Sequence, residues 1–258
     1  MNTADRLKSL VEYFGGAKSS HPIWQVWQEY LSVSPAQGHD EAIAACAIVL
    51  QEIRSLEAAL KRMGVGEVAY RSTFETLRSC WSPTQLSANW SNFKDSVNRV
   101  GVVSVLAWAS WAIRDKSENA VSDEILQSLT EKMAAQEVLL ETVDMPPAIF
   151  EMLHRHIDEL RRAIKFYKVT GIQPVVDIVH RQLGEVTTAP EDVVDELINS
   201  SPEAKNAFSK GIDIIVTAGK VADSGLKVAK FATEIKRISQ SLWDAGKGLI
   251  EYFPRDIS

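Results

Sequence analysis

Two short motifs place acidic and histidine side chains at helical spacing. Glu151 and His154 lie three residues apart, and Asp177 and His180 repeat that spacing further along the chain. Residues i and i+3 share a face of a helix, and two such motifs with two more carboxylates form di-iron sites in bundles. These four residues are therefore candidate metal ligands. The two motifs lie on successive predicted helices, which does not match the arrangement of di-iron sites. The pattern therefore favours a surface contact between His154 and Asp158, and we expect no cofactor.

Other catalytic signatures are incomplete. The segment GGAKSS at 15–20 lacks the leading glycine and the Gly-Lys pair of a phosphate loop, and it follows a helix rather than a strand. Cys46 and Cys80 lie among apolar neighbours, which predicts buried free thiols rather than nucleophiles. No Ser-His-Asp or Cys-His arrangement can be nominated from the spacing, so the sequence nominates no catalytic residue.

Helical periodicity runs through almost the whole chain. Between 39 and 63, apolar residues recur at alternating steps of four and three, which is typical of a buried helix seam. No segment shows a strand pattern, so we expect an all-α, multi-helix bundle. The predicted helices span residues 3–14, 21–31, 39–63, 67–80, 84–115, 122–143, 147–170, 173–183, 191–199 and 201–242.

Charge is distributed unevenly along the 258 residues, whose net charge is −6. Residues 117–200 hold 7 Lys+Arg against 16 Asp+Glu, a net of −9, whereas the flanking parts are slightly basic. This predicts an N-terminal helical region, 1–116, and a second region, 117–258, with the boundary at 116–122. The sequence contains no large basic patch, so a nucleic-acid partner is not expected.

The longest uncharged run is VGVVSVLAWASWAI, residues 100–113. It is shorter than the roughly 20 residues that span a membrane, and a helix that is apolar all round is normally buried. We therefore expect a central core helix here. The pairs Trp24/Trp27 and Trp108/Trp111 are interpreted as core residues as well. The N-terminus lacks the pattern of a secretory signal, so a cytoplasmic protein is expected.

The segment 211–238 carries small residues along its apolar positions and lysines along its edges. Small residues let helices approach closely, so this segment is predicted to be a central bundle helix, an oligomer interface or a membrane-inserting element. The candidate interaction residues are Ile214, Ala218, Gly219, Ala222, Gly225, Ala229 and Ala232.

These patterns favour a non-enzymatic, bacterial-type protein that binds protein chains, its own included. The alternative is a membrane-active helical effector of a toxin or defence type, which exposes 211–238 and 100–113 after a conformational change. An enzyme with an unrecognised helical site is the third hypothesis.

Overall fold

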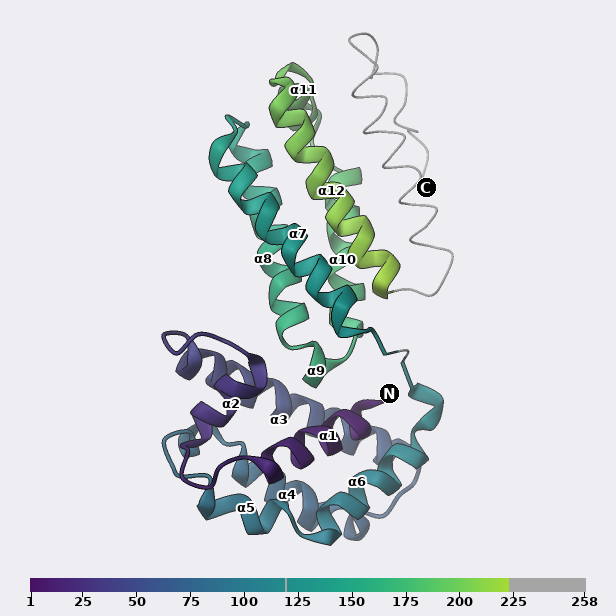
Figure 1. Cartoon of the computed structure of the whole chain (residues 1–258). Helices are drawn as coiled ribbons and strands as arrows, with labels where there is room; N and C mark the ends of the chain where they lie inside the picture. Colours follow the sequence, from purple (N-terminus) through teal and green to yellow (C-terminus); the bar gives the residue numbers. More distant parts are fainter. Residues whose placement is uncertain (119, 223–258) are drawn as a thin grey trace. The chain divides into compact units, whose positions relative to one another are not determined.

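The computed structural model describes residues 1–118 and 120–222, and every regular element within them is a helix (Figure 1). The predicted all-α class is confirmed. The chain divides into two compact units. Unit 1 combines residues 1–120 with 165–172, and unit 2 combines 121–164 with the chain from 173 onward. The change in composition predicted a boundary at 116–122, but it did not indicate that 165–172 belongs with the N-terminal part.

Most predicted helices are present with small shifts at their ends. Unit 1 contains α1 (Thr3–Gly16), α2 (Ile23–Leu31), α3 (Gly38–Arg62), α4 (Arg71–Cys80), α5 (Ser91–Val97), α6 (Val100–Ala112), α9 (Tyr167–Thr170) and the short 3-10 turns η1 (Glu67–Ala69), η2 (Pro83–Gln85) and η3 (Arg114–Lys116). Unit 2 contains α7 (Asp123–Thr142), α8 (Pro147–Lys165, whose last residue lies in unit 1), α10 (Gln173–Thr187), α11 (Glu191–Asn199) and α12 (Pro202–Ala222). Three predictions were wrong. Residues 84–115 form η2, α5 and α6 rather than one helix, and residues 147–170 form α8 and α9 rather than one helix. In addition, α10 continues into the expected loop at 184–190.

The core of unit 1 forms around α1 and α3. The predicted seam of α3 is buried from Ala42 to Leu60, whereas Met63, just past the last turn, is half exposed. Phe14 at the end of α1 lies at the centre of an aromatic cluster, with its ring centroid 4.9 Å from that of Trp27 and 5.1 Å from that of Trp90. The Trp90 indole donates to the Phe14 carbonyl at 2.8 Å, so this large apolar side chain is buried without losing its hydrogen bond.

A buried arginine joins four parts of unit 1. The Arg6 side chain, on α1, is 4% exposed, and its guanidinium contacts Glu52 of α3 at 3.1 Å and Glu118 at 3.3 Å. Its Nε donates to the Val169 carbonyl of α9 at 3.0 Å. Glu118 in turn accepts from the backbone N–H of Ile172 at 3.0 Å. This network holds 165–172 in unit 1, and the chain pattern gave no sign of it.

Unit 2 consists mainly of long helices that run alongside one another, α7, α8, α10 and α12 (Figure 1). α12 packs against α7 and α10. Gln136 is buried in α7 and donates to the Ala207 carbonyl of α12 at 2.7 Å. A Cβ added at Gly211 would lie 2.7 Å from Cδ2 of Leu153 on α8, so α12 approaches its neighbours most tightly where glycine removes the side chain.

The small-residue helix is described only as far as Ala222. Ile214, Ala218 and Gly219 are buried within unit 2. Ala222 lies in the last described turn, while Gly225, Ala229 and Ala232 lie outside the described residues. The burial of the first three fits the bundle-helix interpretation, and their role in association stays a prediction.

Candidate interaction surface

The helix α6 buries only one of its faces. Val102, Leu106, Ala109 and Ile113 point into the core of unit 1 and are at most 5% exposed. On the opposite face, Val100 is 82% exposed, Trp111 64% and Trp108 39%. The prediction that 100–113 is wholly buried is therefore wrong, as is the prediction that the pair Trp108/Trp111 belongs to the core. The expectation for Trp27, which is fully buried, is confirmed.

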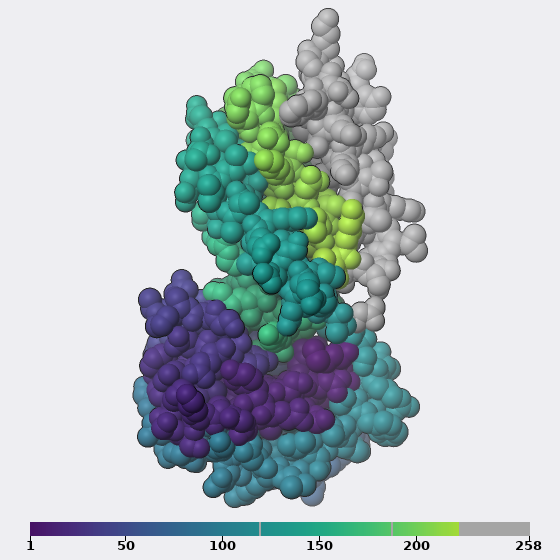
Figure 2. Space-filling model, viewed as in Figure 1, coloured from purple at the N-terminus to yellow at the C-terminus, as the bar shows by residue number. Residues whose placement is uncertain are grey.

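We call the outward set of α6 the α6 face. Its members share exposure to solvent, lack of charge and one side of the helix: Val100, Gly101, Ser104, Ala107, Trp108 and Trp111. A surface helix normally alternates an apolar inward stripe with charged outward positions. Here the outward side carries no charge, and Val100, Trp108 and Trp111 make it largely apolar. The surface of the α5–α6 region is visible as the blue-teal atoms of unit 1 in Figure 2.

Hydrogen bonds to α1 fix which side of α6 faces outward. The Asn2 side-chain amide donates to the Ser110 carbonyl at 2.9 Å, and the Ser110 hydroxyl donates to the Asp5 carboxylate. Asn2 and Asp5 also cap α1 reciprocally, which is a capping box. Because Asn2 and Asp5 are held in place by the α1 cap, α6 cannot rotate to bury its tryptophans without breaking its hydrogen bonds to these two residues.

Cationic side chains lie at both ends of the α6 face. Arg99 precedes the helix, and Arg114 and Lys116 follow it, with Asp115 between them. The Arg114 guanidinium lies over the Trp111 ring, 4.7 Å from its centroid, which is a cation–π contact. Tryptophan and arginine together are the side chains most enriched at protein-interface hot spots.

The sequence contained a signal for this surface. Gly101, Ser104 and Ala107 fall on one side of α6, where small or polar residues would be unusual for a wholly buried helix. The uncharged run conceals it, because a helix without charge is predicted to be buried on all sides. Helical periodicity does not distinguish an apolar face that is exposed from an apolar face that is packed in the core.

The candidate metal ligands do not come together. Glu151, His154, Asp177 and His180 are all exposed. His154 Nδ1 contacts Asp158 at 3.3 Å, as the spacing favoured, and Asp177 accepts from Gln173 at 2.8 Å. Among the described residues, no group of three or more histidine, cysteine or acidic side chains is placed to hold a metal ion.

A buried polar cluster between α8 and α10 was not singled out from the sequence. His156 Nε2 lies 2.9 Å from a Glu185 oxygen, and buried Gln182 donates to the His156 carbonyl at 2.9 Å. Burial lowers the pKa of His156, and the nearby Glu185 only partly opposes this. The bond from His156 lowers the pKa of Glu185. The contacts join two helices.

The thiols of Cys46 and Cys80 are unreactive. Cys46 and Cys80 are free and buried, which confirms their predicted burial. Burial raises the pKa of each to about 12, so both remain protonated at neutral pH. A thiol that is neither exposed nor ionised is a packing residue rather than a nucleophile.

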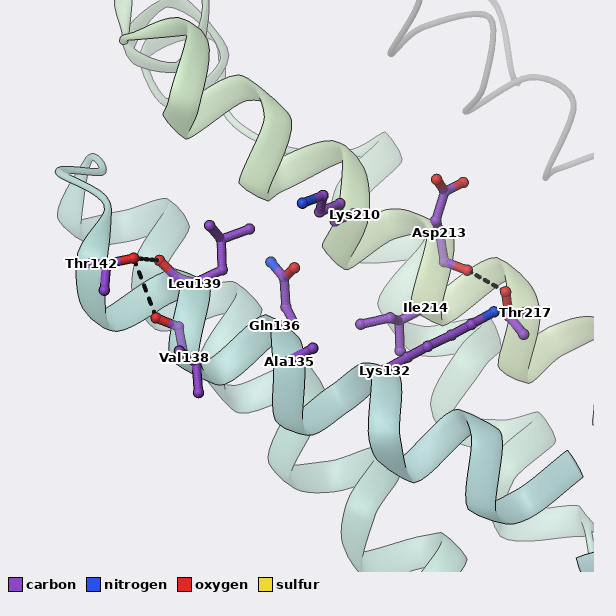
Figure 3. Close-up of a pocket in the computed structure, with 10 residues that line it drawn as sticks. All are labelled: Lys132, Ala135, Gln136, Val138, Leu139, Thr142, Lys210, Asp213, Ile214 and Thr217. Atoms are coloured by element: carbon purple, nitrogen blue, oxygen red, sulfur yellow. Dashed lines mark hydrogen bonds between the residues drawn. The ribbon is translucent and has the colours of Figure 1, made fainter. Parts of the chain in front are cut away.

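A pocket of about 540 Å³ lies between α7 and α12 (Figure 3). Leu139 and Ile214 supply apolar lining, and Lys132, Lys210 and Asp213 supply charge. The hydroxyls of its two threonines already donate to carbonyls of their own helices, so the lysines are its main free donors. The volume suits a small molecule, but its charged residues Lys132, Lys210 and Asp213 are exposed, and the buried amide of Gln136 already donates to the Ala207 carbonyl.

Comparison with protein-family models, curated proteins and solved structures finds no significant match. None of the described helices combines the length and apolar character needed to cross a membrane. The α6 face is therefore the strongest candidate for a functional site.

Proposed function

We propose that this chain acts without catalysis, by associating with protein chains through the α6 face. The observation that supports this is the pair of outward tryptophans, Trp108 and Trp111, on a helix without a single charged residue. Isolated exposed apolar side chains are normal, but a contiguous apolar patch marks an interaction site. Exposed aromatic side chains on an uncharged face, with cations at its rim, match the usual composition of an interface.

The rigidity of the surface supports the same proposal. The α6 face sits on a helix whose orientation is fixed by the α1 cap through Asn2, Asp5 and Ser110. Binding to a preorganised surface does not require the chain to lose much conformational freedom. A flexible loop with the same residues would offer less affinity for the same contact area.

Site-specific photo-crosslinking tests the proposal. A benzophenone amino acid replaces Trp111 in the full chain, and the matched control carries it at Glu75, an exposed residue of α4 in the same unit. We expect light-dependent crosslinks to a protein from position 111 and few from position 75. If position 111 gives no more protein crosslinks than position 75 in the native cells, the proposal is wrong.

A membrane-active effector is the second candidate, and the same tryptophans favour it. Tryptophan is enriched at membrane interfaces, and Arg99, Arg114 and Lys116 would face anionic headgroups. Leakage of dye from vesicles of anionic phospholipid, abolished by Trp108→Ser/Trp111→Ser, would support this candidate. Intact vesicles at protein concentrations where position 111 crosslinks to protein would exclude it.

A further inference from the structure

We propose that the partner of the α6 face is the same face of a second copy of this chain, packed antiparallel about a two-fold axis. In this pairing Ser104 lies beside Ala107 of the partner subunit, and Val100 lies beside Trp111 of the partner subunit. The inference rests on the proposed function and names its partner.

The spacing along the α6 face allows self-pairing in register. Val100, Ser104, Ala107 and Trp111 form its central line, and they follow one another at steps of four, three and four. These steps read the same in both directions, so two antiparallel copies meet in register along the whole line. A two-fold interface must be self-complementary in this way, because the same patch serves both subunits.

The sizes of the side chains fit the same arrangement. The two central positions, Ser104 and Ala107, are small, which lets two helix backbones approach closely. At each end, the large Trp111 would meet the smaller Val100 of the other copy rather than another tryptophan. Gly101 borders the line, and a Cβ placed there would meet nothing within 4 Å, so the surface has open space for a ring beside it.

Charge does not oppose the pairing along its length. From Val100 to Ile113 no residue is charged, so no ion would lose its hydration at the centre of the contact. At each end, Arg99 of one copy would lie near Arg114 and Lys116 of the partner subunit. This like-charge contact weakens the pairing only modestly, because it lies at the rim, where water screens it. A lipid surface would also accept this face, but it would not use the small centre or the symmetric spacing.

The area of the α6 face sets the expected strength. Taking about 250 Å² for a whole tryptophan, the exposed parts of Trp108 and Trp111 amount to roughly 260 Å². With Val100 and the small residues, each copy offers about 400 Å², so a pair buries about 800 Å². Stable complexes usually bury about 1,200–2,000 Å². The pairing is below that range, so a weak dimer that forms only as the protein concentration rises is expected.

Cysteine crosslinking between two different variants tests this geometry. One chain carries Ser104→Cys and the other, with a tag that changes its size, carries Ala107→Cys. They are mixed at tens of micromolar and oxidised. Native Cys46 and Cys80 are buried, with pKa values of about 12, so they should not react. Circular dichroism checks that each variant folds.

We expect the mixed crosslink, which joins the Ser104→Cys chain to the Ala107→Cys chain, to exceed each same-variant crosslink at least five-fold. Trp111→Ser in both chains should abolish the difference. A Glu75→Cys chain, exposed in the same unit, gives the background. Crosslinks at background level, or equal amounts of all three products, would overturn the pairing. A dominant Ser104→Cys homodimer would also overturn it, since that is expected of a parallel pair.

The two proposals fail in different ways. If position 111 crosslinks to some other protein while the mixed cysteine pair stays at background, self-pairing is wrong and the proposed function stands. If position 111 finds no protein at all and the cysteines stay at background, both are wrong. If only phospholipid is crosslinked, the membrane candidate replaces both.

Discussion

Replacing Arg6 with methionine should destabilise unit 1 strongly at neutral pH. Methionine keeps much of the apolar stem, but it leaves Glu52 and the Val169 carbonyl without the donors that lie 3.1 and 3.0 Å away. Removing one member of a buried ion pair typically costs about 3–5 kcal/mol. We expect the free energy of unfolding of unit 1 to fall within that range. Residues 165–172 should detach from the rest of unit 1 before the other helices of that unit unfold.

The stability lost in Arg6→Met should depend on pH, because Glu52 is left without its charged partner. Burial already raises the pKa of Glu52, and Arg6 only partly opposes this, so without Arg6 the pKa rises further. The folded state then holds the Glu52 proton more tightly than the unfolded state does. Stability therefore falls as the pH rises from the ordinary glutamate range through the raised pKa. The Arg6→Met loss should be smaller at pH 5 than at pH 7.5.

Urea unfolding followed by tryptophan fluorescence measures this loss. Trp24, Trp27, Trp81, Trp90, Trp108 and Trp111 all lie in unit 1, so the signal reports mainly on that unit. Lys8→Met is the matched control, because Lys8 lies on the same helix in an exposed i, i+4 pair with Glu12 and should cost at most about 0.5 kcal/mol. An Arg6→Met loss below about 1 kcal/mol, or one that grows on acidification, would refute the reasoning.

Three further predictions concern the rest of the fold. Leu106→Asp should unfold unit 1 because it buries an unpaired charge, whereas Val100→Asp, at 82% exposure, should remain folded by circular dichroism; similar behaviour of the two would contradict the assigned faces of α6. Gly211→Val should cost about 1–3 kcal/mol in urea unfolding through overpacking, whereas Gly184→Ala, with open space around its Cβ, should gain about 0.5–1 kcal/mol; a stabilised Gly211→Val would show that α12 is loosely packed. Burial lowers the pKa of His156, so stability should fall as the pH drops below the ordinary histidine pKa, because the folded state resists protonation of this residue. His156→Gln should weaken that fall in thermal melts at decreasing pH, and an unchanged dependence of the melting temperature on pH would refute the prediction.

The sequence was most informative where burial and periodicity coincide. The α3 seam from Ala42 to Leu60 was predictable because each step of three or four places an apolar residue on one face that the core covers. The helix expected over 122–143 is likewise present as α7, with Ser122 at the N-cap position. These features depend on local pattern alone, and the local pattern was clear.

Tertiary contacts could not be predicted in the same way. The attachment of α9 to unit 1 depends on Arg6, Glu52 and Glu118, which are far apart in sequence and resemble surface charges when read singly. The prediction that 100–113 is wholly buried failed for a different reason. A helix that packs against another chain and one that packs within its own core can have the same uncharged sequence. The small residues Gly101, Ser104 and Ala107 are only a weak signal of exposure, and the exposure of Trp111 in the structure separates the two cases.

The concentration dependence of the native mass tests the central proposal most directly. Sedimentation equilibrium of the full chain, without lipid, should show monomers at low concentration that become dimers across the micromolar range. Trp108→Ser/Trp111→Ser should remain monomeric throughout, with the same helicity and the same urea midpoint. A wild-type chain that stays monomeric at several hundred micromolar, or a variant that dimerises equally well, would contradict association between copies through the α6 face.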